Sequence, residues 1–247
     1  MGILLKRLSL GILILMLAVS AGFVGWASFP LGPGQAAVSA MQSDTVVSVE
    51  TIQDWTVFRP TKMEVQTGLI FYPGGRVDFQ SYAPILRSIA EKDYLVVLVP
   101  MPLSMAFFAP DKADEVLAAF PEIQYWALAG HSLGGAMAAR YCFTNPDEVQ
   151  ALVLWASYPA NTDSLANQKL AVLSIYGSED GQVEKIKESS VLLPADTTWV
   201  EIIGGSHAQF GDYGLQPGDG QASISPQQQW DQVSSATISF LMNISDE

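Results

Sequence analysis

A serine between two glycines is the first residue in this chain whose setting suggests chemistry. Ser132 lies in Gly130-His131-Ser132-Leu133-Gly134, after the apolar run YWALA and before the alanine-rich run GGAMAARYCF. Glycines two residues before and after a serine let a strand and a helix approach each other at a sharp turn. A serine on such a turn presents its hydroxyl for nucleophilic attack. The pattern is short, so its value depends on whether the chain also supplies a base and an acid.

The choice of base is narrow, because the chain has only two histidines. His131 directly precedes the serine, and its side chain is expected to point away from Ser132 at such a turn. That leaves His207, which lies in EIIGGSHAQFGDYG just past the last expected strand. A loop at the carboxyl end of a strand can bring an imidazole over a serine at a neighbouring strand end. We therefore predict that His207 takes the serine proton.

A carboxylate is needed to orient the imidazole and to stabilise its positive charge. Asp180 follows the apolar run KLAVLSIYG, in the turn GSEDG at 177–181. Its neighbour Glu179 is a rival, Asp163 is a weaker one, and Asp180 could instead cap the next helix. The order Ser132, Asp180, His207 is one of the known triad orders, and it favours Asp180 as the acid.

The elements that must position these residues alternate between strands and helices. A hairpin is expected at 45–60. Further strands are expected at 68–73, 94–100, 125–130, 151–157, 169–177 and 197–205, and helices at 78–93, 111–120, after Ser132 and at 224–242. Repeated alternation predicts an α/β fold whose mostly parallel sheet is covered by helices on both faces. A β/α barrel would need eight matched units, whereas this chain opens with strands alone.

The first 29 residues form either a membrane anchor or a signal peptide. Lys6 and Arg7 precede the apolar stretch Leu8–Phe29, which is 22 residues long, and a membrane-spanning helix needs about 20. Signal-peptide cores are shorter, roughly 7–15 residues, so an uncleaved anchor is favoured. Trp26 and Phe29 are then expected at the outer interface, with the two cations on the cytoplasmic side.

Two alternatives for this segment stay open. The leader could be cleaved at either of two sites of small residues, 19–21 and 38–40, which both read Val-Ser-Ala. The remaining alternative is that this segment is a buried core helix. With either an anchor or a cleaved leader, the rest of the chain lies outside the cytoplasm, on the membrane or secreted. Residues 30–43 are expected to be a flexible linker, and residues 44–247 a single catalytic domain.

The charge balance limits the choice of partners. The formal net charge is −13, and the first acidic residue is Asp44, so ten cations face 25 acidic residues from that point onward. Such a surface repels phosphate backbones and anionic lipid headgroups, so no nucleic-acid partner is expected.

No metal ion or organic cofactor is expected either. Cys142 is the only cysteine, so neither an intrachain disulfide nor a cysteine metal cluster can form, and a small buried residue is predicted there. A lipoprotein anchor, which needs a cysteine just after the leader, is excluded as well. Asp212 and Asp219 share a glycine-rich loop, but their spacing matches no metal-binding template.

Over roughly residues 65–245 the chain resembles the α/β-hydrolases, in particular small bacterial enzymes related to dienelactone hydrolases and carboxylesterases. The segments GHSLGG, YGSEDG and GGSHAQFGDYG carry the resemblance. It implies a triad of Ser132, His207 and Asp180 and hydrolysis through an acyl-enzyme. Dienelactone hydrolases proper use cysteine as the nucleophile, so their substrate is not carried over. Many relatives also have His-Gly after the first core strand, where this chain has Tyr-Pro-Gly-Gly at 72–75.

That turn is still the expected oxyanion site, because glycines let backbone N–H groups approach a developing negative charge. We expect the donors to be the N–H groups of Gly75 and Leu133, with Gly74 or Arg76 as close alternatives to Gly75.

The substrate pocket is expected to be open, because only 11 residues separate the strands at 151–157 and 169–177 and leave no room for a lid domain. Met105, Phe107 and Phe108 are the expected apolar wall, with ordinary packing beneath a loop as the alternative.

Together these features predict a serine esterase that is anchored to the membrane or secreted and acts on a small ester. A thioesterase or acyltransferase would use the same residues. A non-catalytic hydrolase-fold module that binds a ligand or partner at the membrane is the alternative from another class. The sequence does not determine the acyl chain length, the physiological substrate or the oligomeric state.

Overall fold

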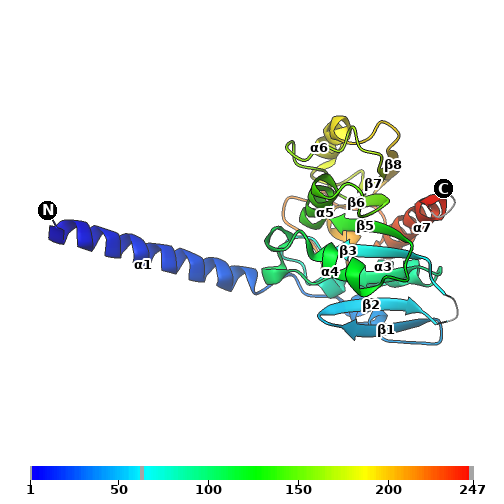
Figure 1. The fold of residues 1–247 in the computed structure, drawn as a ribbon, viewed down its shortest axis with the longest axis horizontal. Helices are drawn as coiled ribbons and strands as arrows, with labels where there is room; N and C mark the ends of the chain where they lie inside the picture. The colour runs from blue at the N-terminus through cyan, green and yellow to red at the C-terminus, as the bar shows by residue number, and fades with distance from the viewer. Residues whose placement is uncertain (1, 62–63, 245–247) are drawn as a thin grey trace.

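The computed structural model describes residues 2–61 and 64–244, and in this part of the chain a single eight-stranded sheet is flanked by helices (Figure 1). The strand order is β1-β2-β4-β3-β5-β6-β7-β8. β1 pairs antiparallel with β2, and β2 antiparallel with β4, while all later neighbours are parallel. The prediction of an open, mostly parallel sheet after an entry hairpin is therefore confirmed.

The strands are β1 (Val47–Ile52), β2 (Trp55–Pro60), β3 (Thr67–Tyr72), β4 (Leu95–Leu98), β5 (Tyr125–His131), β6 (Ala151–Trp155), β7 (Ala171–Gly177) and β8 (Thr198–Ile202). The α-helices are α1 (Gly2–Ala27), α2 (Gln35–Ala40), α3 (Ala83–Ala90), α4 (Lys112–Ala119), α5 (Leu133–Thr144), α6 (Val183–Glu188) and α7 (Pro226–Ile244). Short 3-10 helices are η1 (Phe79–Tyr82), η2 (Pro102–Ser104), η3 (Ala106–Phe108), η4 (Ser189–Leu192) and η5 (Ala208–Phe210).

Both faces of the sheet are buried, because successive side chains of each strand point to opposite sides. Leu69 and Phe71 of β3 pack with α3 and α7 in one core. Ile70 and Tyr72 of the same strand pack with α4 and α5 in the other. This explains why the central strands read as continuous apolar runs rather than as alternating patterns.

The connection between β6 and β7 is short and carries no lid. Residues 156–170 contain only turns and bends, without a helix or strand. This segment agrees with the expected absence of a lid domain. The carboxyl ends of β5, β6 and β7 are therefore covered by loops alone.

Residues 30–43, expected to be a flexible linker, are packed against the domain. They contain α2, and Leu31 forms a parallel bridge with Val77. The N–H of Ala37 donates to Asp212 Oδ2 at 2.9 Å, and Arg87 donates to the carbonyl oxygen of Ala40 at 3.1 Å. The segment is rich in glycine and alanine, which suggested a flexible linker. Its hydrogen-bond partners, however, lie far away in the sequence.

Helix α1 projects away from the body of the molecule (Figure 1). Its stretch Arg7–Ala27 has 21 residues with a mean hydropathy of 2.3, and all of these residues except Ala27 are exposed. A helix of this length and composition can cross a membrane, and a signal sequence would look the same. The buried-core-helix alternative is excluded, because the apolar side chains of this stretch are exposed.

Candidate active site

Ser132 occupies a strained turn between β5 and α5. Its backbone angles are φ 51° and ψ −120°, a conformation that costs a non-glycine residue about 1–3 kcal/mol. A methyl group at Gly130 would meet the backbone of Gly134 and Gly135, and one at Gly134 would meet the carbonyl oxygens of Tyr72 and Pro73. The glycines of the motif are therefore required by the close approach of strand and helix, as the pattern predicted.

Neighbouring strands hold this turn in place. The N–H of Ser132 donates to the carbonyl oxygen of Trp155 at 3.0 Å, and Ser157 Oγ donates to the carbonyl oxygen of Ser132 at 2.6 Å. Ala156, between these two partners, also has a positive φ of 47°. The end of β6 is thus shaped together with the turn that carries the serine.

His207 and Asp180 form a buried pair at the carboxyl ends of β8 and β7. His207 Nδ1 lies 2.9 Å from Asp180 Oδ2, and both side chains are almost completely buried. Because a carboxylate only accepts hydrogen bonds, Nδ1 carries the proton and Nε2 of the neutral ring is left as an acceptor. Asp180 Oδ1 also accepts the N–H of Gln182 at 2.7 Å, which fixes the carboxylate.

The two rival carboxylates are engaged elsewhere. Glu179 is exposed and accepts a hydrogen bond from Ser178 Oγ at 3.1 Å. Asp163 is buried beside Arg140, with 3.5 Å between Oδ1 and the guanidinium, and it also accepts from Thr162. Of the three carboxylates that the sequence offered, the structure places Asp180 against the imidazole.

Ser132 and His207 line one cavity of about 400 Å³. Its other lining residues are Leu133, Ala136, Ala156, Ser157, Tyr158, Ala160, Gln182 and Gln216. Ser132 Oγ makes no hydrogen bond among the described residues, and in the absence of substrate such serine–histidine contacts are commonly loose. The cavity is mostly apolar with a few polar groups, as is typical of small-molecule sites.

The amides of the turn at 73–76 are not equivalent. The N–H of Gly74 donates to Tyr82 Oη at 2.9 Å, and the N–H of Arg76 donates to the carbonyl oxygen of Ser104 at 2.8 Å. The N–H of Gly75 has no partner among the described residues, and a methyl group on Gly75 would lie 3.0 Å from Leu133 Cδ2. Leu133 begins α5, so its own N–H has no partner within the helix. Gly75 and Leu133 thus each offer an amide donor that has no backbone partner among the described residues.

A buried network under the turn was missed in the sequence. Tyr82 Oη lies 2.9 Å from His131 Nδ1, and the His131 ring centroid lies 4.6 Å from that of His207. Burial raises the pKa of Tyr82 and, with a smaller effect from His207, lowers the pKa of His131 well below its usual 6.5. The Tyr82 hydroxyl therefore accepts a hydrogen bond from the N–H of Gly74 and donates one to Nδ1 of a neutral His131. No short-range pattern links these residues, since 49 positions separate the two side chains.

Asp219 is a second residue whose role was missed. Its Oδ1 accepts the N–H of His207 at 3.0 Å, and its Oδ2 accepts the N–H of Ala208 at 2.7 Å. The sequence had paired Asp219 with Asp212 only as a cation site that matched no template. Both carboxylates instead bind backbone N–H groups, and the described residues contain no group of three or more side chains that could hold a metal.

A model of the alpha/beta hydrolase family matches residues 68–231, which is well over half of the chain. The chain belongs to the alpha/beta hydrolase family. This match confirms the resemblance drawn from the three glycine-containing motifs. No curated protein matches the chain.

Solved structures of other hydrolases are similar in fold. Dienelactone hydrolase from Anabaena variabilis is 18% identical with a TM-score of 0.59, covering 80% of this chain and 98% of its own. A predicted CIB-like hydrolase from Thermoplasma acidophilum is 14% identical with a TM-score of 0.58, covering 78% and 98%. A bacterial membrane phospholipase A is 14% identical with a TM-score of 0.56, covering 98% and 100%. At these identities the likeness concerns the fold.

The loop expected to line the substrate pocket of this hydrolase lies beside the cavity. Met105 is buried, and its sulfur lies 3.5 Å from where a methyl group on Gly75 would be, so it packs against the turn at 73–76. Phe107 and Phe108 are about half exposed, with ring centroids 4.3 Å apart. None of the three lines the cavity that holds Ser132 and His207. That lining comes instead from the ends of β5 and β6 and from the loops that carry Gln182 and Gln216.

Proposed function

We propose that this alpha/beta hydrolase is a serine esterase that cleaves carboxylic esters through an acyl-enzyme. The observation that carries the proposal is the 2.9 Å contact between His207 Nδ1 and Asp180 Oδ2, with no partner for Nε2 of the same ring among the described residues and with Ser132 in the same cavity. A serine in this strained conformation, followed by an unused amide at a helix start, is what nucleophilic attack on a carbonyl requires.

In the first half of the reaction, Ser132 Oγ attacks the ester carbonyl carbon and His207 Nε2 takes the hydroxyl proton. The Asp180 carboxylate stabilises the imidazolium that forms, and the amides of Gly75 and Leu133 donate to the oxyanion. When the tetrahedral intermediate collapses, the bond to the alcohol breaks and the proton passes from His207 to the departing oxygen. The acyl group remains on Ser132.

In the second half, His207 removes a proton from water, which attacks the acyl carbon. Collapse of the second intermediate returns the proton to Ser132 Oγ and releases the carboxylic acid. Every step uses groups that line the cavity or border it, and the neutral, Nδ1-protonated state of His207 is the form that the first step needs.

We also propose that α1 anchors the enzyme in the membrane, with the catalytic domain outside the cytoplasm. The packed segment 31–40 supports an uncleaved chain over cleavage near residue 40. Such cleavage would remove the contact of α2 with Asp212 and the bridge from Leu31 to Val77. Cleavage at 19–21 would leave this packing intact. The mass of the purified full-length product distinguishes an intact anchor from a processed one.

Hydrolysis of p-nitrophenyl butyrate by the full chain tests the activity. Wild-type protein is expected to turn over the ester, while Ser132→Ala and Asp180→Ala lose at least about a thousandfold in kcat with circular dichroism unchanged. Equal rates for wild type and Ser132→Ala would contradict the proposal. A folded wild-type protein without turnover on a panel of esters would favour a binding module.

A further inference from the structure

The end of the apolar helix is bound to the turn that carries the oxyanion donor. The guanidinium carbon of Arg76 lies 3.9 Å from the ring centroid of Trp26, and an Arg76 nitrogen donates to the carbonyl oxygen of Phe29 at 2.9 Å. Backbone bonds continue this contact, since the N–H of Leu31 donates to the carbonyl oxygen of Arg76 at 2.8 Å. Arg76 directly follows Gly75, so the last turn of α1 contacts the residue next to the proposed oxyanion donor.

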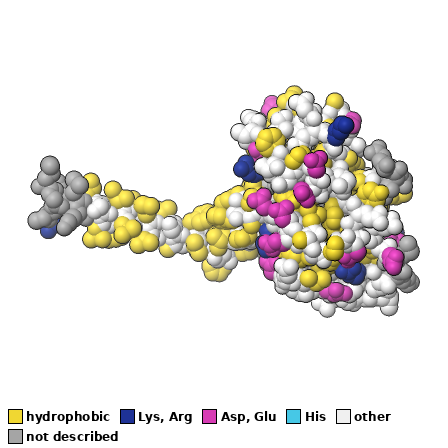
Figure 2. Space-filling view, viewed as in Figure 1, with side chains coloured by type: hydrophobic (Ala, Val, Ile, Leu, Met, Phe, Trp, Pro, Cys, Tyr) yellow, Lys and Arg dark blue, Asp and Glu magenta, His cyan; other side chains and the backbone are white. Residues whose placement is uncertain are grey.

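Exposed aromatic side chains extend the apolar surface of α1 onto the catalytic domain. Phe108 packs against Phe23 of α1, with 6.2 Å between ring centroids, and Phe107 packs against Phe108. Phe29 is 77% exposed, Phe107 45% and Phe108 47%. We name Phe29, Phe107 and Phe108 the aromatic rim. Hydrophobic side chains continue from α1 onto the adjoining side of the body (Figure 2).

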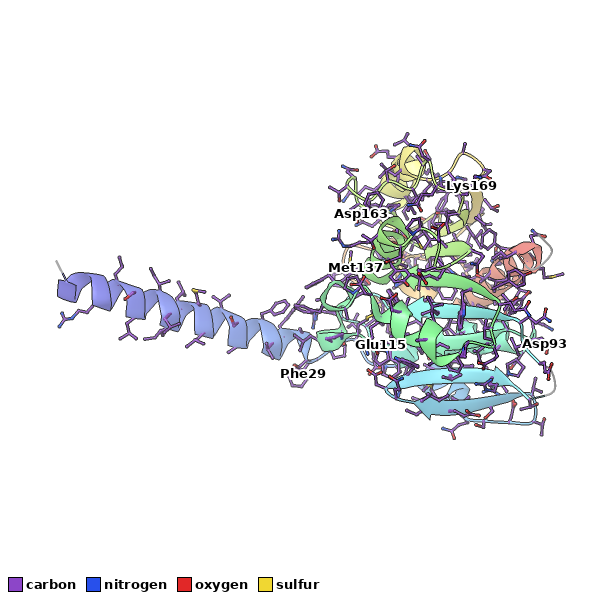
Figure 3. The ribbon with its side chains drawn as sticks, viewed as in Figure 1. Phe29, Asp93, Glu115, Met137, Asp163 and Lys169 are labelled. Carbon is purple, nitrogen blue, oxygen red and sulfur yellow. The ribbon has the colours of Figure 1, made fainter. Side chains whose placement is uncertain are left out.

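The aromatic rim is on the side of the domain where the parallel strands end. Arg76 follows β3 and Phe107 follows β4, whereas Asp93, which precedes β4, lies on the opposite side of the body from Phe29 (Figure 3). Ser132, Asp180 and His207 also follow the carboxyl ends of their strands. The catalytic edge of the sheet and the base of α1 therefore face the same way.

We propose that the aromatic rim rests in the outer interface of the bilayer and that the substrate is an acyl ester of a membrane lipid. The proposed substrate rests on the proposed esterase activity. A spanning helix that starts after Arg7 reaches the far interface at Trp26 and Phe29, where aromatic side chains are favoured. Lipid esters lie at this boundary between headgroups and hydrocarbon, so the anchor holds the serine near its substrate.

The charge of the domain determines how it meets the membrane. From Asp44 onward there are 25 acidic residues against ten cations, so anionic headgroups repel the body. Attachment must therefore come from apolar burial at the rim and not from a basic patch. A zwitterionic lipid such as phosphatidylcholine is the bilayer that fits this surface, and its acyl esters are neutral at the scissile bond.

The position of the rim can be measured without any activity. Full-length Phe107→Cys, labelled with an environment-sensitive nitrobenzoxadiazole fluorophore and reconstituted in phosphatidylcholine vesicles, reports on the rim. Phe143→Cys is the matched control, because Phe143 is 40% exposed near the far end of α5. Cys142 is buried, which raises the pKa of its thiol to about 12, so the wild-type chain serves as the unlabelled blank.

The label at position 107 is expected to shift to the blue and to be quenched by lipids brominated on their acyl chains. The label at position 143 is expected to behave as it does in water. Equal, water-like emission at both positions would overturn the proposed membrane contact, whether or not the protein is an enzyme.

The substrate class is tested by a ratio of two rates. Fatty-acid release from phosphatidylcholine vesicles is divided by hydrolysis of soluble p-nitrophenyl acetate, for full-length wild type, the double variant Phe107→Ser/Phe108→Ser and Phe143→Ser. The double variant is expected to lower this ratio at least about tenfold, and Phe143→Ser to leave it unchanged.

An unchanged ratio in the double variant, or a wild-type enzyme that cleaves the soluble ester but not the lipid, would overturn the lipid-ester substrate while the esterase stands. Failure on both esters would instead contradict the esterase itself and with it the substrate. The fluorophore at position 107 would still decide the membrane contact.

Discussion

Tyr82 Oη lies 2.9 Å from His131 Nδ1 and accepts the N–H of Gly74 at the same distance. One hydroxyl thus joins the turn that carries Gly75, the proposed oxyanion donor, to the strand that precedes Ser132, the proposed nucleophile. The relative position of Gly75 and Ser132 depends on this buried contact, although Tyr82 itself does not line the cavity.

Removing this hydroxyl should therefore slow catalysis without changing the chemistry. Tyr82→Phe leaves the N–H of Gly74 unpaired, which should cost about 1–3 kcal/mol of stability and lower kcat roughly tenfold with KM little changed. Tyr141→Phe is the control, because it also removes a tyrosine hydroxyl that makes a hydrogen bond. Tyr141 of α5 donates to Asp114 of α4 at 2.5 Å. Ester hydrolysis and urea unfolding measure both effects. Equal losses of kcat in the two variants would contradict a positioning role for Tyr82.

Asp219 should hold His207, the proposed catalytic base, through the backbone of that residue. Asp219→Ala removes the acceptor for the N–H groups of both His207 and Ala208, so the loop should loosen and kcat should fall about 10–100-fold. Asp44 is the matched control, because its Oδ1 accepts the N–H groups of Val46 and Val47 at 2.7 and 2.9 Å at the start of β1. Asp44→Ala should leave kcat unchanged. If both variants lose activity to the same degree, Asp219 has only a general structural role.

His131 should make the folded state sensitive to acid. Burial depresses its pKa in the folded protein, whereas the unfolded chain takes up a proton near 6.5. Below about pH 6.5 the unfolded state therefore binds more protons, and stability falls as pH falls, by up to about 1.4 kcal/mol per pH unit from this group. Above that pH the contribution does not change.

Unfolding by urea between pH 5 and pH 8, for wild type and His131→Asn, isolates this contribution. Asparagine can place an acceptor near the Nδ1 position, so the contact with Tyr82 can persist, while the titrating group is lost. The difference in unfolding free energy between the two proteins should change with pH only below about 6.5. A difference that is constant over the whole range would show that His131 is not held neutral.

The sequence was informative where function depends on order along the chain. Ser132, Asp180 and His207 each follow an apolar strand, and parallel strands bring their carboxyl ends to one edge of the sheet. The sequence alone therefore predicted that these three residues lie close together. The continuous apolar runs of the central strands likewise predicted burial on both faces. The family match over residues 68–231 confirms the predicted fold class, while the triad stays a prediction.

What the sequence could not show depends on contacts between distant side chains and backbone groups. Gly74, Gly75 and Arg76 were nearly equal candidates for the oxyanion donor, and they differ only because Tyr82 and Ser104 occupy two of the three amides. The role of Asp219 depends on a loop that folds back 12 residues onto His207. The segment with α2 looked like a tether because its partner Asp212 is 175 residues away.

The measurement that tests the central claim most directly is covalent labelling of the full-length protein with a fluorophosphonate probe, with the adduct located by mass spectrometry. The same reaction is run on Ser132→Ala and His207→Ala, and circular dichroism verifies that all three proteins are folded. An adduct on Ser132 in the wild type, absent from both variants, is the predicted result, because only a serine activated by a base reacts rapidly with such a probe. A folded wild-type protein that forms no adduct, or one that is labelled equally without His207, would contradict the proposed triad.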